Sequence, residues 1–426
     1  MAIAESEFTL EFRRNWRVLV VASCCLLFAL SVPAFFMPFL YPEVIREFGW
    51  SREQAVVLAS WKYVTGSVVA VVVGRFIDVI GVRRVMITVS ALGGLALLSF
   101  LWTPGLAVYY AAGILLGFSG AGTMVSIKVL ISRTFHASQG TAMGIAMLST
   151  GIGQVIVPFA ATFLIAAYGW RVAAALLSTG IWAVALPLMV FYLNDRSFED
   201  EADPGARESR KLAVFDGSVA SAFAGRREFW LIGFAVFAAG FVDQAFSQHL
   251  VLYLQEDLGL GPTIVASALS AIGLVGVLSR PIVGGLFDGL SVRGVSVSYL
   301  VLATACVLAL GALNPWLLSI FVVLRAVGHS AVLLDTLVLA KHTFGLPHIG
   351  VLLGVYTAAV NVGFAAGPPV VARLHSLTGS YAVPFLLCAV VAALAALVLL
   401  PVHPAHRVDA RKGQANGRPL VSAGQE

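Results

Sequence analysis

The chain has 426 residues, of which 59% are hydrophobic and 12% are charged, and its formal net charge is +5. Soluble domains average about 25% charged residues, so this composition excludes an ordinary water-soluble fold. Apolar runs of about twenty residues predict membrane-spanning helices, because lipid offers no partner to an unpaired backbone amide. The runs are continuous and do not alternate with polar residues, which excludes a transmembrane β-barrel.

Twelve apolar segments follow one another along the chain. Turn-forming sequences such as Thr103–Gly105 and Asn314–Pro315 separate them. The predicted spans are 17–41, 53–73, 85–102, 106–132, 140–167, 171–193, 229–254, 262–283, 295–313, 316–340, 349–374 and 380–401. The sequence therefore predicts an all-α membrane protein with twelve transmembrane helices.

A hydrophilic stretch divides the twelve segments into two groups of six. We predict a first six-helix bundle over 1–194, a cytoplasmic linker over 195–227 and a second six-helix bundle over 228–402. The polar residues 403–426 bury too little apolar surface to fold, so we expect a disordered cytoplasmic tail there.

Basic residues are distributed unequally between the two sets of loops. With both termini in the cytoplasm, nineteen Lys and Arg residues fall on the cytoplasmic side, and three lie within the membrane. The outer side receives five, namely Arg46, Arg52, Lys62, Arg171 and Arg373. This bias follows the positive-inside rule and predicts a multi-pass protein of the cell (inner) membrane. It also accounts for the net positive charge without any nucleic acid partner.

The second half of the chain repeats landmarks of the first half at an offset of 210 residues. Seven glycines coincide with glycines in this way, and Asp78, Arg83 and Pro158 meet Asp288, Arg293 and Pro368; the glycines of the first half are Gly49, Gly66, Gly74, Gly140, Gly144, Gly153 and Gly169. Two parallel six-helix repeats are a transporter architecture, with the substrate site between them near the middle of the membrane.

A charged loop follows the second span of each half. The first copy contains Gly74, Asp78, Gly81, Arg83 and Arg84, and the second keeps Gly284, Asp288 and Arg293. The pattern G-x-x-x-D-x-x-G-x-R-R resembles the loop motif of the major facilitator superfamily. The resemblance implies a latch on the inner side that holds one conformation, in which glycine permits close helix approach and aspartate accepts from arginine. The alternative is a simple turn with basic residues.

Further motifs resemble those of monocarboxylate and oxalate-type carriers in this superfamily. They are Phe48–Arg52, Gly169–Arg171, Phe229–Trp230, Thr378–Tyr381 and Ser279–Gly284. The last is similar to the R-P-x-x-G of the monocarboxylate family's eighth helix, which implies that Arg280 contacts a carboxylate. The sequence departs from the family at Gly276, where an acid is common, and it lacks the lysine of the family's first helix.

Five charged residues lie inside predicted spans, where each costs on the order of 3 kcal/mol on insertion scales. They are Lys128, Asp243, Arg280, Arg325 and Asp335. Three cations against two acids leave one positive charge, which a monoanionic substrate would neutralise. Lys128 lies nearer the cytoplasmic end of its span, so its amine can also extend to the membrane surface.

We expect Arg280 to bind the substrate, since guanidinium offers two parallel donors to a carboxylate. Arg325 is a candidate for a second anion contact, and Gln154 and Asn361 are candidates for hydrogen bonds to the substrate. Each has an alternative: Arg280 pairs with Asp243 or Asp335, and the other three join helices to one another.

Asp243 is the leading candidate for the proton carrier, because a carboxyl group in a low dielectric binds a proton more readily. Asp335 and His329 are further candidates for proton coupling, and His329 shares a helix face with Arg325. The alternative for Asp243 is a permanent partner of an arginine.

The sequence contains no P-loop or H-E-x-x-H motif and no cluster with metal-ligand spacing. We therefore expect no catalytic residue, no metal and no cofactor. The predicted function is secondary transport of a small, monocarboxylate-like organic anion by alternating access in symport with a proton, by a monomer in the lipid bilayer. The alternatives are an organic-anion exchanger, a drug–proton antiporter and a non-transporting membrane receptor.

Overall fold

The computed structural model describes residues 2–135, 139–193, 223–345 and 349–402, with side chains from residue 11 onward. These residues form helices joined by short turns. The predicted linker 195–227 lies outside them except for residues 223–227, and the helix that follows it begins at Arg227. The predicted tail 403–426 lies outside them entirely.

The first half contains seven α-helices and three short helical turns within the described residues. They are α1 (Ala2–Cys25), η1 (Leu26–Ser31), α2 (Val32–Phe48), α3 (Arg52–Ile80), α4 (Val82–Ser99), η2 (Phe100–Trp102), α5 (Leu106–Thr134), α6 (Gln139–Thr179), η3 (Gly180–Ala185) and α7 (Leu186–Tyr192).

The second half follows the same plan. Its elements are α11 (Arg227–Leu252), η4 (Tyr253–Asp257), α12 (Pro262–Leu290), α13 (Val292–Leu308), η5 (Ala309–Gly311), α14 (Pro315–Phe344), α15 (Ile349–Thr378) and α16 (Ala382–Leu399). Each predicted apolar span falls on one of these helices or on consecutive helical elements, and several helices continue past the apolar run. For example, α12 reaches Leu290, seven residues beyond the predicted end of that span at 283.

Eleven helices within the described residues are long and apolar enough to cross a membrane. The longest covers Thr141–Tyr192, 52 residues, and it bends at Gly169, whose φ is 77°. At 1.5 Å per residue it spans roughly 78 Å, more than twice the thickness of the hydrocarbon core. It therefore makes two passes, which were predicted as separate helices at 140–167 and 171–193. The twelve-helix membrane fold is confirmed.

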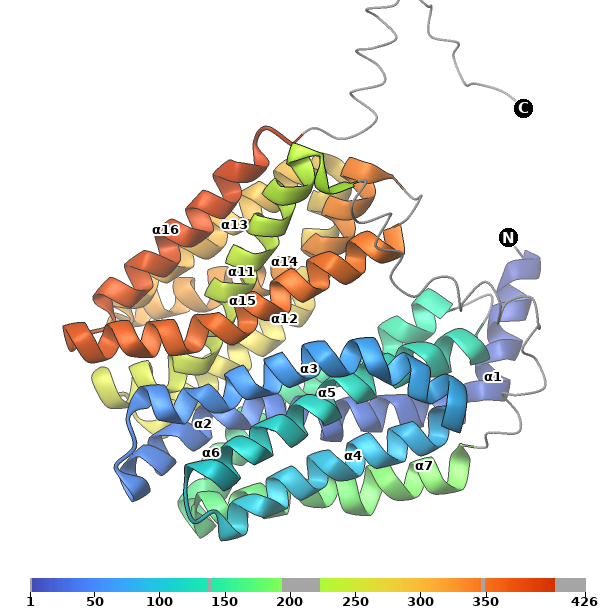
Figure 1. Cartoon of the computed structure of the whole chain (residues 1–426), viewed down its shortest axis with the longest axis horizontal. Helices are drawn as coiled ribbons and strands as arrows, with labels where there is room; N and C mark the ends of the chain where they lie inside the picture. Colours follow the sequence, from blue (N-terminus) through green and yellow to red (C-terminus); the bar gives the residue numbers. More distant parts are fainter. Residues whose placement is uncertain (1, 136–138, 194–222, 346–348, 403–426) are drawn as a thin grey trace, which may run out of the picture.

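The two halves form two bundles that converge at one end and diverge at the other (Figure 1). Where they meet, α3 packs against α15, and α6 packs against α12. The end at which they converge carries ion pairs between the halves, so we call it the closed end. There Arg52 Nη1 lies 2.5 Å from Asp257 Oδ2, and Arg46 Nη2 lies 3.2 Å from Glu256 Oε1. His375 adds a contact of 3.0 Å to Asp257 from within the second half.

Further contacts between the halves continue from the closed end to the middle of the bundles. Ser60 Oγ donates to Ala365 O, and Ser270 Oγ donates to Val155 O, each over 2.7 Å. One turn farther from the closed end, a Cβ on Gly151 would lie 2.2 Å from Val277. The hydrogen bonds and ion pairs that join described residues of the two halves all lie between the closed end and this level.

The repeated charged loops lie at the opposite end, which we call the motif end. Arg133 Nη2 at the end of α5 lies 3.1 Å from Asp78 Oδ1, and Arg83 Nη2 donates to Val190 O over 2.7 Å. These two contacts hold helices of the first half together. In the second copy Ser291 has a φ of 56°, and its hydroxyl lies 2.7 Å from His342 Nδ1.

The glycines at the motif end have open space around them. A Cβ on Gly74, Gly144, Gly284 or Gly354 would meet nothing within 4 Å, leaving aside its own helix backbone. The close helix approach that we expected at Gly74 and Gly284 is therefore wrong for this conformation. The physical reason is that the two bundles have already diverged at this level.

The charges at the closed end give a first prediction. Arg52→Asp places an acid beside Asp257 and should separate the halves by repulsion, and Asp257→Arg in the same chain should restore the pair. We expect Arg52→Asp to raise several-fold the labelling rate of a cysteine at Ala34, in a Cys24→Ser background. The label is a membrane-impermeant maleimide added on the closed-end side. Equal labelling rates with and without Arg52→Asp would show that the pair does not hold this end shut.

Candidate functional site

A pocket lies between the two bundles, just beyond the hydrogen bonds of the closed end. Its volume is about 90 Å³, and it is lined by residues of α2, α3, α6, α11, α12 and α14. One water needs roughly 10–15 Å³ on a comparable measure, so the pocket has room for a small molecule of a few heavy atoms. Its apolar wall includes Phe35, Pro38, Pro158 and Ile272.

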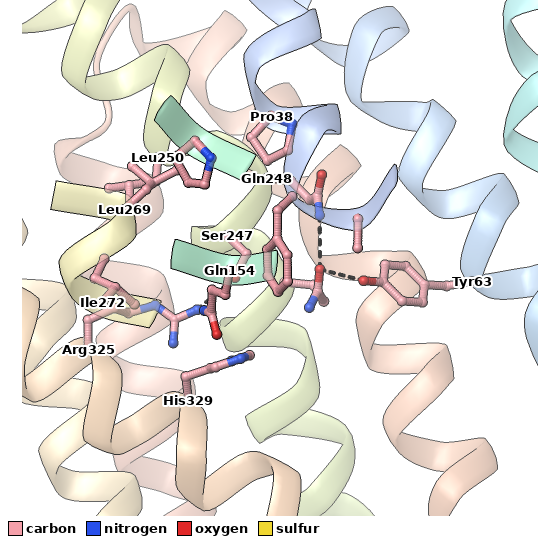
Figure 2. A pocket seen from close by; sticks show the side chains of 14 residues that line it. Pro38, Tyr63, Gln154, Ser247, Gln248, Leu250, Leu269, Ile272, Arg325 and His329 are labelled. Atoms are coloured by element: carbon pink, nitrogen blue, oxygen red, sulfur yellow. Dashed lines mark hydrogen bonds between the residues drawn. The ribbon is translucent and has the colours of Figure 1, made fainter. Parts of the chain in front are cut away.

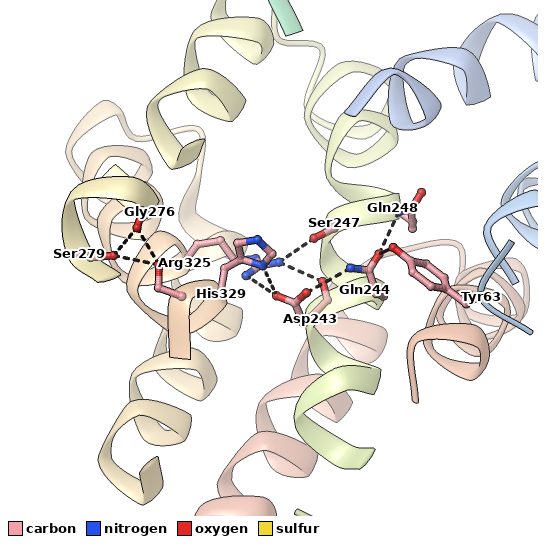
Figure 3. A network of polar contacts seen from close by, with 10 residues as sticks. Tyr63, Asp243, Gln244, Ser247, Gln248, Gly276, Ser279, Arg325 and His329 are labelled. Carbon is pink, nitrogen blue, oxygen red and sulfur yellow. Dashed lines mark hydrogen bonds and ion pairs between the residues drawn. The ribbon is translucent and has the colours of Figure 1, made fainter. Parts of the chain in front are cut away.

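A buried charged triad of Asp243, Arg325 and His329 lies at one end of this pocket, where Arg325 and His329 belong to its lining (Figures 2 and 3). Arg325 Nη1 lies 2.9 Å from Asp243 Oδ1, and His329 Nδ1 lies 2.8 Å from the same oxygen. The Arg325 and Asp243 side chains are only 3% and 1% exposed. Arg325 Nη2 also donates to Asp243 O and to Ser247 Oγ. Because residues four apart share a helix face, α14 presents both of its groups toward α11.

A chain of hydrogen bonds connects this triad to the first half (Figure 3). Gln244 Nε2 donates to Asp243 Oδ2 over 3.2 Å, and Gln244 Oε1 accepts from Tyr63 Oη over 2.9 Å. Gln248 Nε2 also donates to Gln244 Oε1, and Gln248 Oε1 accepts from Tyr41 Oη over 2.6 Å. The motif search singled out none of Tyr63, Gln244 and Gln248. The signal for Gln244 and Gln248 was their four-residue spacing within an apolar span.

Two polar groups at the pocket remain available for a ligand. The Gln154 side chain and His329 Nε2 form no hydrogen bond with the described residues, and both residues line the pocket next to Arg325 (Figure 2). Of the predicted substrate-binding residues, the structure thus brings Gln154 and Arg325 together. It adds His329, which we had predicted for proton coupling.

Arg280 does not line the pocket in this conformation. It lies on α12 three residues beyond Val277, toward the motif end, and is half-buried. Its Nε is buried without a hydrogen-bond partner, and the described residues offer its guanidinium no ion pair. The alternative that Arg280 pairs with Asp243 or Asp335 is therefore wrong here.

The remaining predicted residues lie away from the pocket. Asp335 Oδ2 accepts from Tyr299 Oη over 2.5 Å, and the other oxygen is buried without a partner. Ten residues separate Asp335 from Arg325, which is about 15 Å along the helix. Asn361 is half-buried on α15 and does not line the pocket. Lys128 is exposed on α5, which corrects the prediction that its charge is buried within the protein.

Lys62 was assigned to the outer loops, and this assignment is wrong. Helix α3 begins at Arg52 with a capping box formed by Ser51 and Gln54, so Lys62 lies ten residues inside the helix. Its residue exposure is 8%, and Nζ lies 4.9 Å from the centroid of the Tyr63 ring. The predicted span 53–73 contained Lys62, and this was the signal for its burial.

The sequence is similar to known transporters over most of its length. The family model described as Major Facilitator Superfamily matches residues 19–324 and 290–425. The probable sulfoacetate transporter SauU of Cupriavidus necator is 23% identical over 389 residues, covering 86% of this chain and 89% of that protein. Monocarboxylate transporter 4 of Gallus gallus is 23% identical over 373 residues, covering 84% and 76%. The monocarboxylate-like branch that the motifs indicated is confirmed.

The triad predicts how the protein responds to loss of a charge. Asp243→Ala leaves Arg325 buried without its counter-charge, which should lower stability by about 3–5 kcal/mol. Adding Arg325→Met removes the orphaned charge and should recover most of the loss. The midpoint of thermal unfolding of the detergent-purified protein measures both effects.

Asp288→Ala is the matched control, since Asp288 is an exposed acid on α12. Its unfolding midpoint should not move. A double variant as unstable as Asp243→Ala would contradict the idea that the unpaired charge causes the loss.

Proposed function

Because this chain belongs to the major facilitator superfamily and is a membrane transporter, we propose that it moves a small organic anion by alternating access in symport with a proton. The pocket between the bundles carries the proposal. It combines a buried guanidinium with two polar groups, the Gln154 amide and His329 Nε2, that form no hydrogen bond with the described residues. A cavity of about 90 Å³ suits a small substrate better than a drug-sized one.

The relatives support the substrate class. One bears the name of a sulfoacetate transporter and the other that of a monocarboxylate transporter. Sulfoacetate and monocarboxylates share a carboxylate on a short carbon chain. A carboxylate in the pocket would meet Arg325 and the Gln154 amide at one end, beside the His329 ring, and apolar side chains such as Phe35 elsewhere.

In the proposed binding step, the substrate carboxylate competes with Asp243 for Arg325. Guanidinium presents two parallel donors, a geometry that either carboxylate can accept. When the substrate takes this position, Asp243 loses its main counter-charge and takes up a proton, with His329 as its hydrogen-bonded neighbour. Asp335, which is held by Tyr299, is the alternative carrier. Arg280 attracts the anion on the route from the motif end toward the pocket.

A second candidate is exchange of organic anions without proton movement. The observation in its favour is that Asp243 is already held by Arg325 and His329. An acid that remains paired throughout the cycle would not carry a proton. Counterflow that proceeds at the same rate with and without a pH difference would favour exchange.

The positive-inside distribution orients the protein with its motif end and both termini in the cytoplasm of the cell, within the inner membrane. In this orientation the described conformation is closed toward the outside. We propose that the protein works as a monomer and that its bundles rock about the pocket to expose the opposite side. Closure of the motif end would bring the latch residues of the two loops near the other half.

Arg280 tests the anion-binding proposal. In vesicles with an inward proton gradient, Arg280→Gln should lower carboxylate uptake by tenfold or more, the equivalent of about 1.4 kcal/mol. Arg373→Gln removes an exposed arginine near the closed end of α15 and should retain uptake. Robust uptake by Arg280→Gln would refute the role of Arg280.

The open glycines test the rocking motion. Gly144 precedes Gly151 by seven residues and Gly284 follows Val277 by seven, so each lies two turns beyond the contact of Gly151 with Val277, on the same helix faces. Gly144→Val with Gly284→Val should fold normally, since a Cβ meets nothing within 4 Å. It should block closure and abolish transport.

Gly285→Val is the matched control on the same helix. A Cβ there also meets nothing within 4 Å, but Gly285 shares its helix face with Leu278 and Ile282, which are 64% and 74% exposed. Transport by this variant should match the unmodified protein. Transport by the Gly144/Gly284 double valine variant at the same rate would show that these helices do not approach each other at the motif end.

A further inference from the structure

Lys62 is a buried cation for which the described residues provide no hydrogen bond and no acidic partner. Only 8% of the residue is exposed, and the nearest interaction of its ammonium group is with the Tyr63 ring, at 4.9 Å. Such a charge inside a membrane span costs on the order of 3 kcal/mol. A cation–π interaction with an aromatic ring offsets about 0.5–2 kcal/mol of this cost. An anionic partner at Lys62 would offset the remaining cost.

The position of Lys62 connects it to the pocket already described. Tyr63 lines the pocket and hydrogen-bonds to Gln244. Figure 2 shows Tyr63 at one end of the pocket, with Arg325 and His329 at the other. Lys62 itself does not line the pocket, but its ammonium group lies against the ring of Tyr63, which does. A cationic residue of the first half therefore lies beside one end of the pocket, and Arg325 of the second half lines the other end.

The net charge of the residues in and beside the pocket differs before and after the substrate binds. Asp243 neutralises Arg325 in the described structure, whereas Lys62 is not neutralised. In the proposed cycle a substrate carboxylate takes the place of Asp243, which becomes neutral on taking up a proton. Two cations then face the substrate, so a substrate with one negative charge would satisfy only one of them.

We propose that Lys62 binds a second anionic group of the substrate. The class of substrate is then a small anion with two acidic groups on a short carbon spacer, such as a dicarboxylate or a sulfonate–carboxylate. This inference rests on the proposed function of the same pocket. The substrate bridges the two halves, with one acidic group held by each, and its size is limited by the cavity of about 90 Å³.

Binding of two matched probes to the purified full-length protein tests this proposal. Malonate carries two carboxylates, and propionate has the same number of carbons but one carboxylate. By titration calorimetry the unmodified protein should bind malonate about tenfold or more tightly than propionate, as a charge-assisted contact implies. Lys62→Met should lose this preference and bind propionate within threefold of the unmodified protein. Lys62→Arg should retain the preference.

Lys341→Met is the matched control, because it removes an exposed lysine at the motif end of α14. It should leave both affinities unchanged. If Lys62→Met does not fold, the preference of the unmodified protein and of Lys62→Arg for malonate over propionate still tests the proposal.

Four results would overturn the inference. If the unmodified protein binds propionate at least as well as malonate, Lys62 holds no second acidic group, and the proposed transport of a monoanion stands. An equal loss of both probes in Lys62→Met would mean a structural role. If Lys62→Met still binds malonate but loses uptake driven by a proton gradient, Lys62 serves proton coupling and does not bind the substrate. Absence of binding by either probe would overturn both the inference and the proposed function.

Discussion

The ion pair of Arg325 and Asp243 is the interaction on which the pocket depends. Both side chains are almost completely buried, so neither charge can be hydrated, and each is stable only beside the other or beside a replacement. The pair joins α11 to α14 and fixes the orientation of His329. Through Gln244 it also reaches Tyr63 in the first half. A substrate anion can replace Asp243 without leaving Arg325 unpaired, which is why a structural ion pair is also suited to binding.

The ion pairs between the halves have a different environment and a different consequence. The side chains of Arg52 and Asp257 are 22% and 20% exposed, and those of Arg46 and Glu256 are more exposed still. Exposed pairs contribute only about 0–1 kcal/mol each. These ion pairs therefore add only a modest cost in free energy to opening of the closed end. The strong, buried pair lies inside the second half, so rocking of the two halves does not require it to break.

The number of helices could be predicted from sequence because the lipid environment leaves so few solutions. Twelve apolar segments had to become helical passes, and a glycine at 169 was enough for two of them to continue through a bend. The contacts among the pocket residues were less predictable from the sequence. Arg280 and Arg325 both lie in spans near acidic residues, and which arginine meets Asp243 depends on how α11 packs against α14. Burial of Lys62 was predictable from its place inside the span 53–73, although we assigned this residue to the outer side. Its contact with the ring of Tyr63, the next residue of α3, depends on side-chain conformations that the sequence does not specify.

The internal repeat explains why both interfaces between the halves have open glycines at the motif end. The offset of 210 residues relates Gly74 to Gly284 and Gly144 to Gly354. Across the interfaces, however, the helix pairs are α3 with α15 and α6 with α12, so Gly74 belongs with Gly354 and Gly144 with Gly284. Tyr63 of α3 contacts Phe364 of α15; Gly74 follows Tyr63 by eleven residues and Gly354 precedes Phe364 by ten. In the other pair, Gly144 and Gly284 are each seven residues from the contact of Gly151 with Val277. Similar spacing places the members of each pair at a similar depth along the helices. One glycine pattern, duplicated with the half, thus leaves room in both interfaces for the same closing movement.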